Sequence, residues 1–412
     1  MQALCVLVLA LGMASPLLSS RLHAQSADVS VYTGVLGPGF QDRSTAPHAF
    51  GITAPATPTT AARGPVISWD TQPWLGLSFA NEAATPVSAV GALRLWVNGG
   101  STGGQEFTVE ARSNDQLVAG AAVTTLLGHP VAANTWAEVV LPIPLTSLYN
   151  PATSIDNVAL YADASVGHGT IYLDNIAFTA RTANSPTGEP APVFPPAPLA
   201  CRNRTIRVMP LGDSLTAYPE SYRGPLYRTL VGDGWNVDFV GSALDPPVGG
   251  GDPDHEGHGG APIGPGGYSS IADHVANWLA AANPDVILLN IGANDVGARR
   301  SVAIDAPLRL LRLVQAIMVQ RPATVLLVGD VPPNGWNLDN FVEQRDLNAM
   351  AASIGNASGR DGVVHVPIWP RLRAGWNTDT DTVDKEHFSV SGGIRFAQAW
   401  LPELRRNPKP LQ

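Results

Sequence analysis

A proline-rich stretch near the middle of the chain separates two parts whose residue patterns differ. Residues 181–203 show no apolar periodicity and carry a run of prolines: Pro186, Pro190, Pro192, Pro195, Pro196 and Pro198. Proline fixes φ and removes a backbone donor, so this composition predicts a stiff, extended linker. We therefore expect the 412 residues to form separate domains on either side of it.

The part before the linker, residues 27–180, carries short apolar or alternating runs separated by turn residues. Alternation with a period of two is typical of half-buried strands, and we find no comparable window with a helical period. We expect strands at residues 66–69, 74–79, 92–97, 106–111, 136–142, 157–162 and 170–178. This pattern predicts an all-β sandwich, jelly-roll-like in type.

The part after the linker, residues 204–408, alternates apolar strands with segments of helical period. We expect strands at residues 206–211, 237–240, 286–291, 323–328 and 363–368, and helices near residues 222–230, 270–282, 306–320, 338–357 and 391–404. Such alternation predicts an α/β/α three-layer domain with a parallel five-stranded sheet. Ligands of such sheets bind at the carboxyl ends of the strands.

The overall charge of the chain argues against one class of binding partner. Asp and Glu total 34 against 25 Lys and Arg, which gives a formal charge of −9. A surface that holds nucleic acid needs the opposite sign, so we expect no nucleic-acid partner. The two cysteines, Cys5 and Cys201, are too few for a metal site or a redox motif.

The chain begins with a segment typical of export. Residues 1–24 contain an apolar run from position 3 to 13, then small residues and a plausible cleavage point after Ala24. This predicts a secretory signal peptide and an extracellular or periplasmic protein. No later segment reaches the 18 to 20 apolar residues that a membrane helix needs, so we expect no membrane span in the mature protein.

Polar groups follow two of the predicted strands of the second half. Ser214 comes after the first strand in Gly-Asp-Ser, and Asn294 follows the third strand in Gly-Ala-Asn-Asp. Taken alone, each of these motifs is better explained as a helix cap or turn. At a shared sheet edge, however, the serine can act as a nucleophile and the asparagine side chain can donate to an oxyanion.

A third candidate lies after the last predicted strand, in Asp384-Lys385-Glu386-His387. Three-residue spacing on a loop allows the carboxylate of Asp384 to orient the imidazole of His387, which can then act as a base toward a serine. A solitary loop histidine is more often surface decoration. The combination with Ser214 is what favours catalysis.

These motifs, in this order and at these strand ends, resemble the SGNH (GDSL) hydrolase superfamily. The blocks are residues 212–214, Gly260, residues 292–295 and residues 384–387. The stretches at 209–216, 221–223, 237–242 and 254–260 further resemble family three of the carbohydrate esterases, the acetylxylan esterases. The resemblance covers nearly all of the second half.

The resemblance implies a serine esterase with the catalytic triad Ser214, Asp384 and His387. It also implies an oxyanion hole formed by the Ser214 N–H, the Gly260 N–H and the Asn294 side chain. Ala261-Pro262 replaces the aromatic residue that the family usually has after the glycine. The resemblance assigns the acidic and histidine residues at 252–258 to an active-site loop, which we prefer to a metal site, and we expect no cofactor.

The first half resembles the β-sandwich modules of secreted bacterial glycan enzymes, in residues 31–32, 39–42, 93–100 and 172–176. This implies a carbohydrate-binding module. The leading expectation is hydrolysis of O-acetyl esters on a polysaccharide. The alternatives are a lipid, lysophospholipid or aryl esterase of the same superfamily and a glycan-binding protein without activity; the oligomeric state stays open.

Overall fold

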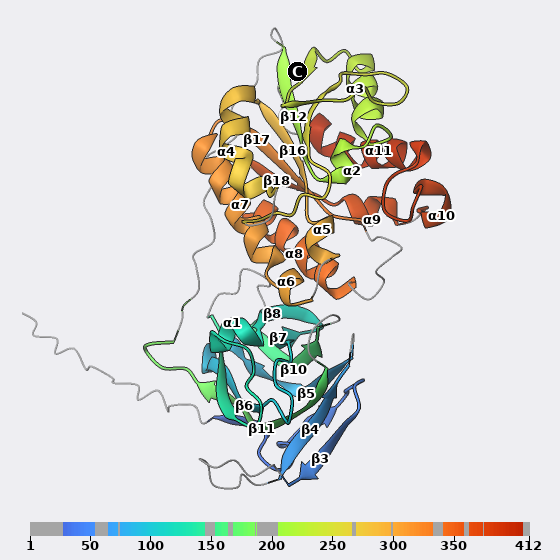
Figure 1. Cartoon of the computed structure of the whole chain (residues 1–412). Coiled ribbons are helices and arrows are strands. Elements are labelled where there is room, and N and C mark those ends of the chain that lie inside the picture. The colour runs from blue at the N-terminus through green and yellow to red at the C-terminus, as the bar shows by residue number, and fades with distance from the viewer. Residues whose placement is uncertain are drawn as a thin grey trace, which may run out of the picture.

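The computed structural model describes residues 28–53, 65–72, 75–144, 153–163, 168–185, 187, 205–265, 269–297, 300–332, 341–357, 362–373 and 375–406. They form a β-rich half up to residue 180 and an α/β half from residue 206 onward (Figure 1). The predicted signal peptide lies outside the described residues. Of the predicted linker, residues 181–203, only residues 181–185 and 187 are described. None of the helices within the described ranges is long and apolar enough to cross a membrane.

Two antiparallel sheets build the β-rich half. The six-stranded sheet has the order β3-β4-β11-β6-β9, with β1 also pairing with β11: β1 (Val29–Tyr32), β3 (His48–Ile52), β4 (Val66–Thr71), β6 (Val90–Asn98), β9 (Trp136–Pro142) and β11 (Gly169–Ala180). The five-stranded sheet has the order β2-β5-β10-β7-β8: β2 (Phe40–Asp42), β5 (Gly76–Pro86), β7 (Phe107–Ser113), β8 (Gln116–Ala122) and β10 (Ser154–Ala162). Two short helices, η1 (Val87–Ala89) and α1 (Val123–Leu127), connect strands.

One hydrophobic core lies between these two sheets. Trp69 on β4 and Phe107 on β7 meet edge to face with ring centroids 5.3 Å apart, and both are fully buried. Val109 and Ala111 on β7 point into the same core, as the alternating pattern requires. The expectation of a β-rich first half is confirmed.

The α/β half is built on a seven-stranded sheet of order β14-β15-β12-β16-β17-β18, with β13 pairing with β12. The strands are β12 (Ile206–Gly212), β13 (Val237–Phe239), β14 (Ala243–Leu244), β15 (Asp254–Gly257), β16 (Val286–Asn290), β17 (Val325–Gly329) and β18 (Val363–Val366). All pairs are parallel except β14 with β15. The carboxyl ends of β12 and β16 therefore lie side by side.

Helices cover both faces of this sheet. The longer ones are α3 (Arg223–Gly232), α4 (Ile271–Ala282), α7 (Ala306–Gln320), α8 (Phe341–Ala357) and α11 (Val390–Arg406), and the short ones are α2 (Ser214–Ala217), α5 (Ala293–Val296), α6 (Arg300–Ala303), α9 (Ile368–Leu372) and α10 (Thr378–Asp381). Helices α4, α7 and α8 pack in one group, and α3, α9 and α11 in another. Figure 1 shows these groups on opposite sides of the sheet.

The expected sheet of five parallel strands is wrong in its count and in being all parallel. All five expected strands form, but β14 and β15 extend the sheet, and β14 runs antiparallel. These two strands contain two and four residues, and β15 reads Asp-His-Glu-Gly. Segments this short carry no strand periodicity, so they become strands through their neighbours: β15 pairs with β12, and β14 pairs with β15.

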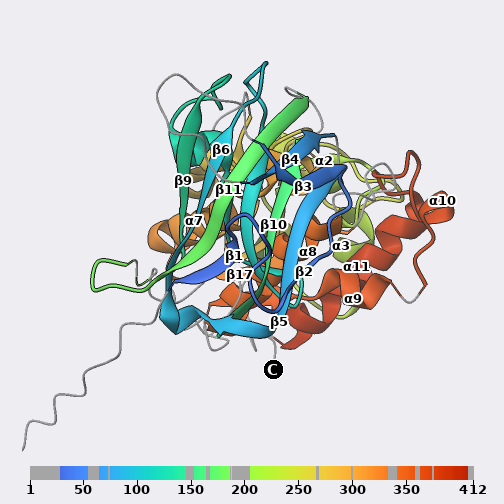
Figure 2. The same cartoon turned by 90° about the horizontal axis from the view of Figure 1, so that it is seen from below.

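The two halves contact each other directly. Helices α6 and α8 pack against β7 and β8, at the top of the β-rich half in Figure 1. Seen from below, the strands of the β-rich half lie in front of α7 and α8, while α11 lies to their right (Figure 2). The proline-rich segment is thus not the sole connection between the halves.

Candidate active site

The sheet places Ser214 at the carboxyl end of β12. Gly212 pairs with Asn290 of β16, and a Cβ at Gly212 would lie 1.9 Å from the Asn290 carbonyl oxygen, so the strands can approach only with glycine there. Asp213 caps α2 by accepting a hydrogen bond from the Leu215 N–H at 3.0 Å. Ser214 is the first residue of α2, where backbone N–H groups have no partner within the helix.

Asp384 and His387 lie together in the loop before α11. The Asp384 Oδ2 and the His387 Nδ1 are 2.6 Å apart, and the Asp384 Oδ1 accepts the His387 backbone N–H at 2.7 Å. Lys385 between them adopts a left-handed φ of +73°, which closes the turn. The Asp384 side chain thereby orients the imidazole and leaves Nε2 for another partner.

The environment of Asp384 keeps it ionised. Partial burial would raise its pKa, but hydrogen bonds from the His387 side chain and from the backbone N–H groups of His387 and Glu386 outweigh this and lower the pKa below the ordinary aspartate value. An ionised Asp384 can accept a hydrogen bond from Nδ1 of His387 and so fix the orientation of the ring.

Tyr218 links this loop to Ser214. Its ring stacks flat on the imidazole of His387, with centroids 4.1 Å apart and an interplanar angle of 12°. The Tyr218 N–H donates to the Ser214 carbonyl at 3.0 Å, so one helical turn carries both the serine and the stacking ring. Among the described residues no hydrogen bond joins the Ser214 hydroxyl to His387, a contact that often tightens only when substrate is bound.

The two other expected oxyanion donors lie on neighbouring loops. Asn294, in α5 after β16, donates from Nδ2 to the carbonyl of Ala261 at 3.0 Å, which ties its side chain to the loop of Gly260. Gly260 adopts φ +73°, and a Cβ there would meet open space, so its backbone lies at the surface of the loop. The second N–H of the Asn294 amide remains for a ligand.

A buried carboxylate anchors the loop that carries Gly260. Glu256 is fully buried and accepts hydrogen bonds from the Ser242 N–H at 2.8 Å and the Ser242 hydroxyl at 2.6 Å. Its Oε1 also lies 2.6 Å from Nε2 of His258, whose ring stacks on Trp278 with centroids 4.2 Å apart. The His258 N–H donates to the Gly212 carbonyl at 2.9 Å, which joins this loop to the strand before Ser214.

The acidic and histidine residues at 252–258 are engaged with protein groups. Asp252 accepts the backbone N–H groups of Phe239 and Asp254, and His255 Nδ1 accepts the Gly257 N–H at 3.0 Å. Burial, with a smaller contribution from Arg223, lowers the pKa of His255 to about 4, so the ring is neutral. No group of three or more His, Cys, Asp or Glu side chains in the described part of the chain is arranged to hold a metal ion.

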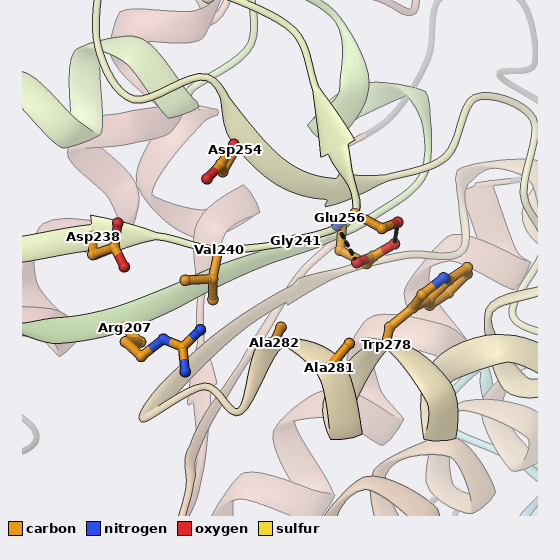
Figure 3. A pocket seen from close by; sticks show the side chains of 10 residues that line it. Arg207, Asp238, Val240, Gly241, Asp254, Glu256, Trp278, Ala281 and Ala282 are labelled. Carbon is orange, nitrogen blue, oxygen red and sulfur yellow. Dashed lines mark hydrogen bonds between the residues drawn. The ribbon is translucent and has the colours of Figure 1, made fainter.

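A hollow of about 240 Å³ lies between β13, β15 and α4 (Figure 3). Arg207 and Asp238 line one side of it, and Glu256 and Trp278 line the other. Neither Ser214 nor His387 is among its described lining residues. Glu256 and Trp278, which both contact His258 of the Gly260 loop, are among its lining residues.

Tyr218, Glu256 and Trp278 were not expected as individual contributors. Glu256 fell inside the block at 252–258, but its sequence context does not separate a loop anchor from a ligand. Tyr218 carries no motif of its own, since its role depends on a loop 169 positions later (387 − 218). Only the folded chain brings these groups together.

Comparison with known proteins agrees with this arrangement. The GDSL-like Lipase/Acylhydrolase family matches residues 211–393, which include all the expected triad and oxyanion residues. The multidomain esterase of Ruminococcus flavefaciens is 27% identical over 237 residues, which make up 52% of this chain and 30% of that protein. The chain thus spans under a third of the length of this curated relative.

Two solved structures are also similar. The family 3 carbohydrate esterase of Clostridium thermocellum is 30% identical, with 49% of this chain and 97% of that chain covered and a TM-score of 0.41. The family 3 carbohydrate esterase of Talaromyces cellulolyticus is 25% identical, with 50% and 100% covered and a TM-score of 0.42. As the sequence motifs predicted, residues 211–393 belong to the GDSL/SGNH lipase-acylhydrolase family, a family of carboxylic ester hydrolases.

Proposed function

We propose that this chain is a serine esterase in which Ser214 is the nucleophile, His387 the general base and Asp384 the residue that orients it. The observation that carries the proposal is the 2.6 Å contact between Asp384 and His387, stacked through Tyr218 onto the turn of Ser214. A triad needs a base held by a carboxylate, and the Asp384–His387 contact supports that part of the proposal.

The reaction follows from these positions. The Ser214 hydroxyl attacks the ester carbonyl while His387 Nε2 accepts its proton, and the new oxyanion is held by the N–H groups of Ser214 and Gly260 and by the Asn294 amide. The alcohol leaves with the proton from His387. Water then attacks the acyl-serine by the same route, releasing the acid and restoring Ser214.

The substrate that we propose is an O-acetyl or other short acyl ester on a polysaccharide such as acetylated xylan. The block motifs resemble family three of the carbohydrate esterases, and the curated relative is named an esterase. The family also hosts lipases, so a lipid, lysophospholipid or aryl ester is the second candidate. A glycan-binding protein without activity is disfavoured by the paired Asp384 and His387.

The test measures acetate release from a panel of acetylated polysaccharides, beside aryl esters of increasing acyl length. We expect release from acetylated glycans and a preference for short acyl chains. Ser214→Ala is the matched control, and it should lower kcat by on the order of 10⁴ or more with unchanged circular dichroism. A preference for long acyl chains would favour the lipid candidate, and full activity in Ser214→Ala would remove the proposed mechanism.

We further propose that residues 27–180 form a jelly-roll-like β-sandwich that binds carbohydrate. A groove of about 470 Å³ lies over β5, β10 and the turn between β7 and β8, and side chains that can bind sugar hydroxyls line it, among them Asn81, Asn114 and Asn157. In this proposal residues 1–24 are a signal peptide, residues 181–203 a linker and residues 204–408 the hydrolase of an exported enzyme.

A further inference from the structure

Three polar side chains of β7 point away from the core of the five-stranded sheet, yet they are buried. Side chains alternate along a strand, so Thr108, Glu110 and Arg112 lie on the face opposite Val109 and Ala111. Their exposed fractions are 0%, 0% and 2%. The α/β half covers this face, since α6 and α8 pack on β7 and β8 (Figure 1).

Arg112 joins the two halves through a buried ion network. Its Nε lies 2.6 Å from Glu110 Oε2 within the same strand, and its Nη2 lies 3.0 Å from Asp346 Oδ2 on α8. Asp346 is only 6% exposed, and its Oδ1 accepts the Leu117 N–H of β8 at 3.3 Å. Loss of Arg112 would leave two buried carboxylates without a cation, so this residue holds α8 against the β-rich half.

The other side of α8 holds the loops at the carboxyl ends of the strands. Gln344 and Asn348, one turn apart, both donate to the Val331 carbonyl, at 2.6 Å and 3.0 Å. Leu347 packs directly on Gly292: a Cβ added to Gly292 would lie 2.4 Å from the Cδ2 of Leu347. Gly292 is the N-cap of α5, the helix that carries Asn294.

We propose that the β-rich half contributes to catalysis by positioning an oxyanion donor. The Glu110–Arg112–Asp346 network positions α8. Helix α8 in turn positions the Gly292 turn, which directs the Asn294 side chain toward the oxyanion. In this role Arg112 and Asp346 are positioning residues. The proposal rests on the oxyanion role of Asn294 given under the proposed function.

The other catalytic groups depend on different contacts. Ser214 is held by β12 and α2, which meet α5 through the hydrogen bond from the Ala293 N–H to Asp213. His387 is held by Asp384 and Tyr218, and none of these residues belongs to α8. Damage to the network should therefore act mainly on the oxyanion donor. A loss of the oxyanion contribution with an intact nucleophile and base would therefore distinguish a positioning role of the network from a general loss of stability.

The first measurement compares kcat and KM of the full chain and of Arg112→Met on a soluble aryl acetate. We expect kcat to fall about tenfold and KM to stay within about twofold, because an oxyanion donor acts in the transition state alone. Arg94→Met is the matched control, since Arg94 lies in the other sheet and pairs with Glu138 at the surface. It should keep wild-type kcat.

A double-mutant comparison tests whether the effect passes through Asn294. Asn294→Ala alone should lower kcat by about 10²-fold. Adding Arg112→Met to it should lower kcat by less than about twofold more, because the donor that the network positions is already gone. An equal tenfold loss in both backgrounds, or a loss that falls in KM, would overturn the proposal.

Asp346→Asn decides the matter if Arg112→Met does not fold. The asparagine still accepts the Leu117 N–H and leaves Arg112 paired with Glu110, while it weakens the link across the halves. We expect kcat to fall about threefold with unchanged circular dichroism. Wild-type kcat in this variant would sink the inference, whereas wild-type kcat in Asn294→Ala would show that the oxyanion assignment itself is wrong.

Discussion

Tyr218 is placed to hold the imidazole of His387, the proposed general base, at a fixed tilt. The residue is 40% exposed, and its ring stacks on one face of His387. Asp384 fixes one edge of the imidazole, and a stacked ring restricts rotation about that contact. The base thus has two supports, one polar from its own loop and one aromatic from the turn of Ser214.

Replacing Tyr218 should reveal this support in the turnover rate. We expect Tyr218→Ala to lower kcat about tenfold, since a poorly oriented base loses part of its contribution of 10² to 10⁴. Tyr218→Phe keeps the ring and should retain more than about half of kcat. Steady-state kinetics on a soluble ester decides the point, and wild-type kcat in Tyr218→Ala would show that the stacking is incidental.

At the scale of elements, α2 begins on a buried carboxyl. Asp213 accepts the N–H groups of Leu215 at 3.0 Å and of Ala293 at 3.3 Å, and so joins β12, α2 and α5. Burial dominates these hydrogen bonds and raises the pKa of Asp213 to about 7. An unfolded aspartate has a pKa of about 3.9, so between these values the folded chain binds one proton more than the unfolded chain.

This difference predicts how stability depends on pH. Because the folded state holds the extra proton, the contribution of Asp213 to stability declines as pH rises from about 4 to about 7 and is constant above. The Asp213→Asn variant has no titrating group at position 213. Its melting temperature should therefore fall less than that of the wild type between pH 5 and pH 8. Thermal unfolding followed by circular dichroism measures both slopes, with exposed Asp379→Asn as control. Equal slopes in wild type and Asp213→Asn would contradict the assignment.

Most elements of the α/β half follow from apolar periodicity. The helix expected at residues 306–320 forms as α7 with those bounds, and the strand expected at 206–211 ends one residue later. The sequence did not predict the strands β14 and β15, because their residues have low strand propensity and form strands only by pairing with a neighbour. Of the site, the motifs indicated the triad and oxyanion residues, whose roles stay predictions. They could not indicate Tyr218 or Glu256, whose contacts arise only on folding.

For the whole molecule, the proline-rich segment favoured two domains on a spacer, while the structure buries polar residues between the halves. In sequence, Thr108, Glu110 and Arg112 alternate with apolar residues as solvent-facing side chains do. Nothing local distinguishes a strand face that meets water from one that meets another domain. Their burial becomes visible only when Asp346 is brought opposite Arg112.

Such packing should make the chain unfold as one unit. We expect a single calorimetric transition whose van't Hoff and calorimetric enthalpies agree, because unfolding of either half breaks the Arg112–Asp346 ion pair and the packing of α6 and α8 on β7 and β8. Arg112→Met should separate the transition into two. Two well-resolved transitions in the wild-type chain would show that the halves are independent.

The Arg112–Asp346 pair also has a consequence for how the two halves of this chain can recombine with other domains during evolution. The two residues stand 234 positions apart, one in each half, and each neutralises the other inside the protein. A recombination that joined this hydrolase half to another β-rich domain would leave the buried Asp346 carboxylate without the Arg112 guanidinium. Positions 112 and 346 should therefore change together among descendants of this chain, and the two halves should travel as one gene segment.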